Sequence, residues 1–177
     1  MTFERLEAGP ACRAGCILAT GEIEKGSAEA FTQFARANHI RRGARVIFDS
    51  PGGVLLEGLR LGRAIRDAGL VTSVGRFEDG EFIAGGQCVS ACAYAFLGGV
   101  QRRVLGDGRL GVHQFAAAID SQGLTASDAQ TLMGLIAIYL DRMVGKTSVL
   151  TLAAATPPAD TRWLSAHELR RYALVTD

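Results

Sequence analysis

Apolar residues along the chain alternate between short continuous runs and helical spacing, which predicts strands and helices in turn. Short apolar runs predict strands at 16–21, 45–48 and 71–74. Helical spacing predicts one helix that begins at Ser27 and ends near residue 38, and a second that Gly69 closes. Repeated strand–helix alternation is typical of an α/β fold with largely parallel strands covered by helices.

The second half of the chain continues this pattern. Residues 75–86 predict an exposed hairpin or loop, and residues 90–97 predict a short buried helix before a strand at 110–115. Thr125 is expected to cap a long helix that ends at Val144. A capping box at Ser165 predicts a last helix, followed by a strand at 173–176.

The composition fits one globular domain. The chain has 177 residues, of which 48% are hydrophobic and 21% charged, so it is long enough to bury a sizeable core. The formal net charge is +1 and no basic run exceeds two residues, which disfavours a nucleic-acid partner. The longest apolar window, residues 132–140, is too short to cross a bilayer, so no membrane span is expected.

The N-terminus and the cysteines bear on the compartment. Residues 1–9 carry three charges and no apolar segment, so no secretory signal is visible. We expect either a cytoplasmic protein, or a periplasmic or exported one whose leader has been removed. The pairs Cys12/Cys16 and Cys88/Cys92 are spaced too widely for typical zinc ligands, and no metal is expected. Both pairs are compatible with disulfides, and the alternative for Cys88 and Cys92 is that they are free, small buried residues that pack a turn.

A turn of sequence Pro51-Gly52-Gly53 follows the strand at 45–48 and precedes a helix. Glycines at such a turn let the backbone approach a ligand closely and leave N–H groups exposed. Turns of this composition are also common as plain strand-to-helix connections. The turn alone therefore leaves both interpretations open.

Ser90 lies where a strand-like segment turns into the predicted buried helix, with Ala91 and Ala93 as small neighbours. An exposed hydroxyl oxygen at such a turn can attack a carbonyl carbon, while the N–H of Ala91 points toward the developing oxyanion. The G-x-S-x-G pattern of a nucleophile elbow is absent. A serine that caps a buried helix is the alternative.

His113 is the histidine best placed to act as a base. His39 and His167 are predicted to be solvated surface residues, whereas His113 lies in the strand-like run 110–115. A general base also needs an orienting carboxylate. Spacing does not choose among the available carboxylates, which are Asp120, Asp128, Asp141, Asp160 and Glu168.

Four segments in this order resemble the Clp-type serine peptidases: DSPGGVLLEG, QCVSACAYAFLGG, GRLGVHQF and TRWLSAHELRRYALV. The resemblance extends from about Cys16 to the C-terminus, and it is closest to a divergent, often exported branch with a serine between two cysteines. It implies an α/β fold built as a ClpP/crotonase-like spiral of ββα units. Residues 1–15 would form an N-terminal extension and residues 16–177 one Clp-like peptidase domain.

The resemblance implies a serine peptidase that needs no cofactor. Ser90 falls on the family's nucleophile and His113 on its general base, with the backbone N–H groups of Gly53 and Ala91 as the oxyanion hole. Each such donor typically lowers the barrier by about 3 kcal/mol. Peptide bonds would be hydrolysed through an acyl-enzyme at Ser90.

The acid of the catalytic triad is where this sequence departs from the family pattern. The family aspartate precedes an Arg-aromatic-Leu-Ser string, and Thr161 occupies that slot with Asp160 one residue earlier. Asp160 is the candidate acid if the loop shifts. Otherwise the site is a Ser/His dyad, or Thr161 or a backbone carbonyl holds the base. Losing the orienting carboxylate can cost about four orders of magnitude in turnover.

The resemblance also bears on partners. It implies a peptide or protein substrate and a homo-oligomer that assembles through the helix beginning at Thr125. Residues 75–86 are longer than the corresponding family loop, so they are expected to cover or reshape the substrate groove. Residues before Cys16 offer no equivalent of the segment that docks the unfoldase ring, so an ATPase partner is not supported.

Three alternative functions stay open at this point. One is a catalytically degenerate Clp-fold protein that binds peptides or assembles with partners, since Asp160 is displaced from the family position. Another is a crotonase-type acyl-CoA enzyme that uses the same amide pair to stabilise an enolate, although that chemistry usually relies on carboxylates. The third is a thiol-redox role for Cys88 and Cys92.

Overall fold

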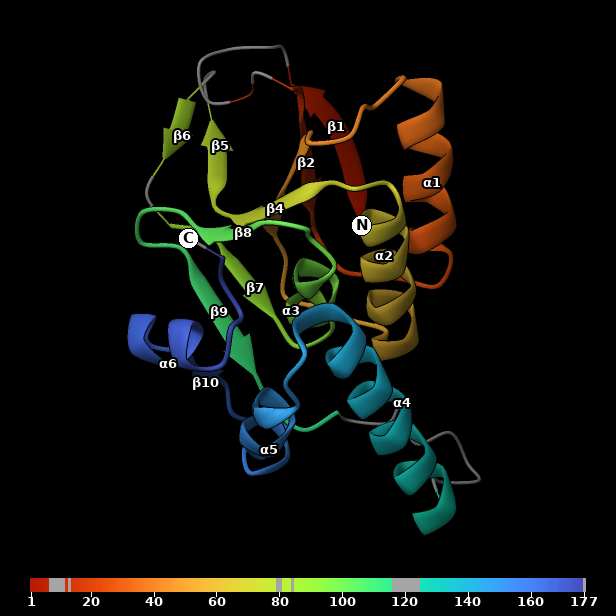
Figure 1. Cartoon of the computed structure of the whole chain (residues 1–177), viewed down its shortest axis with the longest axis vertical. Helices are drawn as coiled ribbons and strands as arrows, with labels where there is room; N and C mark the ends of the chain where they lie inside the picture. Colours follow the sequence, from red (N-terminus) through yellow and green to blue (C-terminus); the bar gives the residue numbers. More distant parts are fainter. Residues whose placement is uncertain (7–11, 13, 79–80, 84, 116–124, 177) are drawn as a thin grey trace.

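The protein is a mixed α/β domain with two sheets in which most neighbouring strands are parallel (Figure 1). The computed structural model describes residues 1–6, 12, 14–78, 81–83, 85–115 and 125–176. The larger sheet has the strand order β1-β2-β3-β4-β8, in which β1 is antiparallel to β2 and all other pairs are parallel. Its strands are β1 (Thr2–Leu6), β2 (Cys16–Thr20), β3 (Arg45–Asp49), β4 (Val71–Val74) and β8 (Arg102–Val104).

The smaller sheet has the order β10-β9-β7, with β7 parallel and β10 antiparallel to β9. An isolated bridge between Ser50 and Cys88 joins the end of β3 in the larger sheet to β7 of the smaller one. A separate antiparallel hairpin, β5 with β6, confirms the hairpin expected within residues 75–86. These strands are β5 (Arg76–Glu78), β6 (Glu81–Ile83), β7 (Gln87–Val89), β9 (Arg109–Val112) and β10 (Arg162–Trp163).

Six helices occur in the described part of the chain: α1 (Ser27–Ala37), α2 (Leu55–Asp67), α3 (Ala91–Leu97), α4 (Ala126–Val144), α5 (Ser148–Ala154) and α6 (Ala166–Arg171). Helices α1 and α2 lie side by side, whereas α4 extends away from the body of the molecule (Figure 1). The expected N-cap at Thr125 and the expected capping box at Ser165 are confirmed, and the structure shows that Thr125 also forms a capping box, with Asp128.

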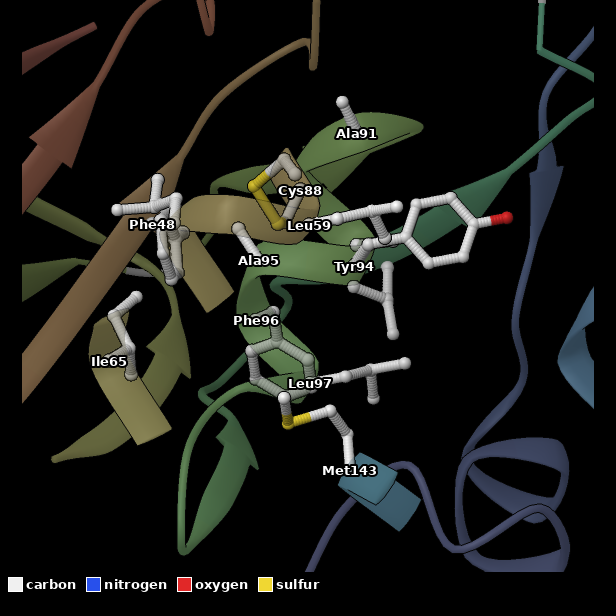
Figure 2. Close-up of a cluster of buried hydrophobic side chains, with 14 of the residues drawn as sticks. Phe48, Leu59, Ile65, Cys88, Ala91, Tyr94, Ala95, Phe96, Leu97 and Met143 are labelled. Carbon is white, nitrogen blue, oxygen red and sulfur yellow. A yellow bond between two sulfur atoms is a disulfide. The ribbon is translucent and has the colours of Figure 1, made fainter. Parts of the chain in front are cut away.

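Helix α3 lies at the centre of the core, and all seven of its residues are buried. Apolar side chains from α2, α4 and β3 surround it, among them Leu59, Met143 and Phe48 (Figure 2). From α4, the Tyr139 hydroxyl donates a 2.7 Å hydrogen bond to the Tyr94 carbonyl. The short buried helix expected at 90–97 is thereby confirmed, with its first helical residue at Ala91.

The prediction of a strand at 173–176 is wrong. Ala173 has a positive φ of 57°, and the segment that follows is hydrogen-bonded to Arg102 instead of forming a ladder. The buried Arg102 guanidinium donates to the carbonyls of Gly99, Ala173 and Leu174 at 2.9 Å each. Burial first, and the charge of Arg66 second, lower the pKa of Arg102 to about 10. These carbonyls therefore solvate a buried cation.

Three further differences from the sequence-based expectations concern element boundaries. Thr2–Leu6, within the expected N-terminal extension, form edge strand β1 of the larger sheet. Strand β9 ends at Val112, so His113 follows the strand instead of lying within it. Helix α5 was not expected from the sequence, and its N-cap Thr147 makes no side-chain cap bond. No helix in the described ranges is long and apolar enough to cross a bilayer.

Candidate active site

Ser90 occupies a sharp turn between β7 and α3. Its backbone has φ 57° and ψ −121°, a region that non-glycine residues rarely adopt. The Ser90 N–H donates to the Gly111 carbonyl at 3.0 Å, and its carbonyl accepts from Ala93 N–H at 2.9 Å. Ser90 is the N-cap of α3, yet its side chain makes no cap hydrogen bond. The half-buried hydroxyl is therefore left available.

The Pro51-Gly52-Gly53 turn lies directly against the Ser90 turn. Gly52 has φ 101°, and a Cβ placed there would lie 2.5 Å from the Val89 carbonyl oxygen and 2.9 Å from Ser90 Cβ. It would also lie 3.2 Å from Ala91 N. Only glycine fits this contact, so the glycine turn and the serine turn, which are far apart in the sequence, meet in the structure.

Two amide groups at this contact have no acceptor. Within the described part of the chain, neither the N–H of Gly53 nor that of Ala91 donates a hydrogen bond. Gly53 pairs with Ile23 in an isolated bridge, where Ile23 N–H donates to Gly52 O at 2.6 Å and Val54 N–H donates to Ile23 O at 2.8 Å. This pairing fixes the Gly53 backbone while leaving its own N–H available to a ligand.

Glu57 supports the helix that follows the glycine turn and was not singled out by sequence reasoning. This buried carboxylate accepts from Ala28 N–H at 3.2 Å and pairs with Arg60 at 2.7 Å. Burial opposes its ionisation, but the hydrogen bonds from Arg60 and Ala28 outweigh this and lower the pKa of Glu57. Through its hydrogen bond from Ala28, the Glu57 carboxylate links the start of α1 to α2. Glu57 lies about one helical turn after Gly53.

His113 follows the end of β9, beside the end of β7. The parallel register pairs Val89 with Gly111, so Ser90 and His113 leave the same end of the smaller sheet. His113 Nδ1 lies 2.6 Å from the Gln114 carbonyl oxygen. A carbonyl only accepts, so this contact requires Nδ1 to carry the proton, which leaves Nε2 with the free lone pair. No hydrogen bond joins Ser90 Oγ to His113 in the described part of the structure.

Thr161 and Asp160 directly precede strand β10. The antiparallel register pairs Arg162 with Val112, so one further step of it would bring Thr161, rather than Asp160, opposite His113. The Thr161 methyl group lies 2.6 Å from where a Cβ on Gly111 would be, so a larger residue there would have to displace the Thr161 side chain. Asp160 is exposed, and its N–H donates to the Pro157 carbonyl at 3.0 Å. Its carboxylate makes no hydrogen bond to any described residue.

The other candidate carboxylates are occupied elsewhere. Asp128 caps α4, and Asp141 is exposed on α4. The Glu168 carboxylate accepts a hydrogen bond from the Arg162 guanidinium. This bond is the largest cause that lowers the pKa of Glu168 to about 2, and hydrogen bonds from the Ser165 N–H and hydroxyl add to it. Asp120 lies outside the described residues. Among the carboxylates that the structure describes, none is hydrogen-bonded to His113.

A pocket of about 290 Å³ opens beside His113. It lies between α3, α4, α5 and the end of β9, and its walls are largely apolar. Tyr94, one helical turn after Ser90, is a lining residue that sequence reasoning missed. Burial raises the pKa of Tyr94 to about 12, so its hydroxyl stays neutral. The remaining lining residues are Gln114, Phe115, Met133, Leu150, Ala153 and Ala154.

Both cysteine pairs form disulfides. Cys12 is bonded to Cys16, and Cys88 to Cys92, with Cα atoms 5.3 Å and 5.1 Å apart. The second bond spans the turn that carries Ser90. All four cysteines are buried, and the disulfide interpretation of Cys88 and Cys92 is confirmed over the alternative of free buried cysteines.

Two solved structures resemble this chain across nearly its whole length. ClpP1 from Listeria monocytogenes superposes with a TM-score of 0.67 at 18% sequence identity, covering 90% of this chain and 88% of that chain. A point mutant of ClpP1 from the same organism gives a TM-score of 0.64 at 19% identity and the same coverage. The fold is that of ClpP. At this identity the likeness to ClpP shows the fold alone. No protein-family model matches the sequence, and no curated protein matches it.

We predict that Gly52→Ala destabilises the protein more than Gly21→Ala. Both glycines have positive φ, but a Cβ at Gly21 meets nothing within 4 Å, whereas at Gly52 it meets the Val89 carbonyl and Ser90. The steric overlap should lower the free energy of unfolding of Gly52→Ala by about 1–3 kcal/mol more than that of Gly21→Ala. Urea unfolding of both variants measures the difference. Equal free energies of unfolding would contradict the close contact between the two turns.

Proposed function

We propose that the protein is a serine hydrolase that cleaves peptide bonds through an acyl-enzyme at Ser90. The observation that carries this proposal is the Ser90 turn, in which an uncapped hydroxyl is followed by the unbonded N–H of Ala91. The serine oxygen attacks the carbonyl carbon, and the carbonyl oxygen takes up the negative charge. The N–H groups of Ala91 and Gly53 would donate to that oxygen.

In this mechanism His113 Nε2 takes the proton of Ser90 and later gives it to the leaving amine. Water then hydrolyses the ester, with the same nitrogen as base. The Gln114 carbonyl holds Nδ1–H, which fixes the tautomer as an aspartate does in a triad. A carbonyl dipole stabilises the imidazolium less than a carboxylate does, so slow turnover is expected. Ser90 and His113 must approach when substrate binds, as catalytic hydrogen bonds often tighten only in the complex.

The pocket beside His113 supports a preference for apolar side chains. A side chain adjacent to the scissile bond would enter between α4 and α5, against Met133 and Leu150. The neutral Tyr94 hydroxyl, which also lines the pocket, would hydrogen-bond with a polar atom at the end of that side chain. Peptides with a medium-sized apolar residue before the scissile bond are therefore the proposed substrates.

A fluorophosphonate probe tests this proposal. The Ser90 oxygen should displace fluoride from phosphorus, giving a covalent adduct that mass spectrometry assigns to Ser90. Ser90→Ala should abolish the adduct, and His113→Ala should slow labelling by about 10²–10⁴-fold. Ser148→Ala and the exposed His39→Ala are the matched controls and should label normally. A folded wild-type protein that stays unlabelled would refute the hydrolase.

A second candidate function is a peptide-binding protein without hydrolysis, which the lack of a Ser90–His113 hydrogen bond among the described residues favours. Such a protein would bind peptides with apolar side chains in the same pocket and leave them intact. Isothermal titration of a peptide that is recovered uncleaved, together with absent probe labelling, identifies this function. Met133→Trp should block it by filling the pocket.

We predict that Thr161→Asp accelerates labelling of Ser90. One step beyond the printed pair Arg162–Val112, the antiparallel register would bring this position opposite His113, and a carboxylate there would stabilise the imidazolium. An increase of at least about tenfold is expected, since the carboxylate of a full triad is worth up to about 10⁴ in turnover. Asp160→Asn should leave the rate unchanged because its carboxylate is exposed. Loss of labelling in Asp160→Asn would instead make Asp160 the acid.

We also infer that the protein self-associates through α4, in keeping with the ClpP fold. This helix extends from the body and exposes Leu135 and Ile138, the latter 58% accessible. Ile138→Lys should shift the sedimentation coefficient toward the monomer, whereas Gln130→Lys on the exposed start of α4 should not. A wild-type chain that sediments as a monomer at all concentrations would contradict the inference.

A further inference from the structure

We propose that the Cys88–Cys92 disulfide is a positioning clamp that holds the Ser90 turn in its reactive conformation. The clamp affects chemistry only if Ser90 is the nucleophile, so this consequence rests on the proposed function. Its effect on the backbone of the turn is independent of that function. Both cysteines are fully buried, so they act through the Ser90 turn as positioning residues.

The Cys88–Cys92 disulfide joins the strand before the Ser90 turn to the helix after it. Cys88 lies on β7 and Cys92 in the first turn of α3, two residues before and two residues after Ser90. Both side chains are fully buried, and the disulfide lies in the apolar cluster that includes Leu59 and Ala95 (Figure 2). The bond therefore fixes the distance between the strand and the helix that the Ser90 turn must span.

The turn needs such a constraint because its usual stabiliser is missing. A serine at the N-cap normally accepts a hydrogen bond from an N–H of the first helical turn. Ser90 makes no such bond, so its hydroxyl is free for attack but the start of α3 is uncapped. Its φ of 57° with ψ −121° persists only where the surroundings over-determine the backbone. The disulfide supplies a covalent constraint where the cap would otherwise act.

Hydrogen bonds hold the turn to the strands on one side, and the Ala93 N–H donates to the Ser90 carbonyl at 2.9 Å on the helix side. Ser90 N–H donates to Gly111 O at 3.0 Å, and Val89 N–H donates to Ser50 O at 3.1 Å. On the helix side, the Ala91 N–H is unbonded within the described residues. The covalent link from Cys88 to Cys92 is thus the strongest restraint that joins the two sides across Ser90.

The second disulfide provides a matched control. Cys12–Cys16 has the same sequence separation of four, and it is buried in a separate small cluster with Leu6 and Ile47. Cys16 pairs with Arg45 at the start of β3, whereas Cys88 bridges to Ser50 just after its end. Five residues of strand separate these two points, roughly 16 Å. The control therefore removes an equivalent bond far from Ser90.

The experiment compares Cys88→Ala/Cys92→Ala with Cys12→Ala/Cys16→Ala, which leave no unpaired thiol. The first double variant should slow fluorophosphonate labelling of Ser90 at least tenfold and lower kcat on a peptide with little change in KM. Amide hydrogen exchange at residues 89–93 should accelerate at least tenfold. The control double variant should alter each of these by less than twofold, even where it lowers the unfolding temperature.

Each outcome decides a separate point. Retained labelling and unchanged exchange in Cys88→Ala/Cys92→Ala overturn the clamp and leave the hydrolase standing. An unlabelled wild-type protein refutes the hydrolase, and exchange at 89–93 still decides the clamp. Mass mapping of the unreduced wild-type protein should give a Cys88–Cys92 linked peptide, and free thiols there would overturn the proposal.

A reduction experiment covers the case in which the double variant fails to fold. A water-soluble phosphine in mild urea transfers two electrons to the disulfide, which takes up two protons to give two thiols, while the phosphine gains an oxygen from water. Protein reduced at Cys88–Cys92 and returned to buffer should label at least tenfold more slowly and recover on reoxidation by oxidised glutathione. An unchanged labelling rate after verified reduction overturns the clamp.

Discussion

The close contact between helices α2 and α3 is the constraint on which the rest of the site depends. A Cβ at Gly58 would collide with the backbone of Ala91, and one at Gly62 with Tyr139 and the carbonyl of Tyr94. At Gly58 the two helices therefore meet backbone to backbone, while at Gly62 the Tyr139 hydroxyl fills the space and binds the Tyr94 carbonyl of α3. Because α3 cannot shift sideways, its first residue has a fixed place, and the turn that carries Ser90 has to bend sharply to reach it from β7.

Local signals in the sequence predicted much of the fold. Thr125 and Ser165 predicted helix starts because a capping box involves only neighbouring residues, and 45–48 predicted a strand because a buried run is visible directly. The expected strand at 173–176 failed because its carbonyls bind Arg102, a partner 71 and 72 residues away in the sequence. Long-range partners of this kind leave no local pattern.

The same distinction between local signals and long-range partners applies to the candidate site. Ser90 and the glycine turn could be predicted because order and residue type carry the signal, and their contact follows in the structure. The sequence left a backbone carbonyl as one possible partner of His113, but it could not single out that of Gln114, since every residue carries a carbonyl. Nor could it give the register of β10 against β9, on which the position of Thr161 depends. With Glu168 held by Arg162, no carboxylate of the described ranges is bonded to the imidazole.

The buried Arg102 makes the segment after the last helix part of the core. Among the described residues its guanidinium has no carboxylate partner, and it relies on the carbonyls of Gly99, Ala173 and Leu174. Two of these three acceptors follow every helix and strand of the described chain. Without them strand β8 would bury a cation with too few acceptors. The edge of the larger sheet therefore depends for its stability on a segment that belongs to no helix or strand.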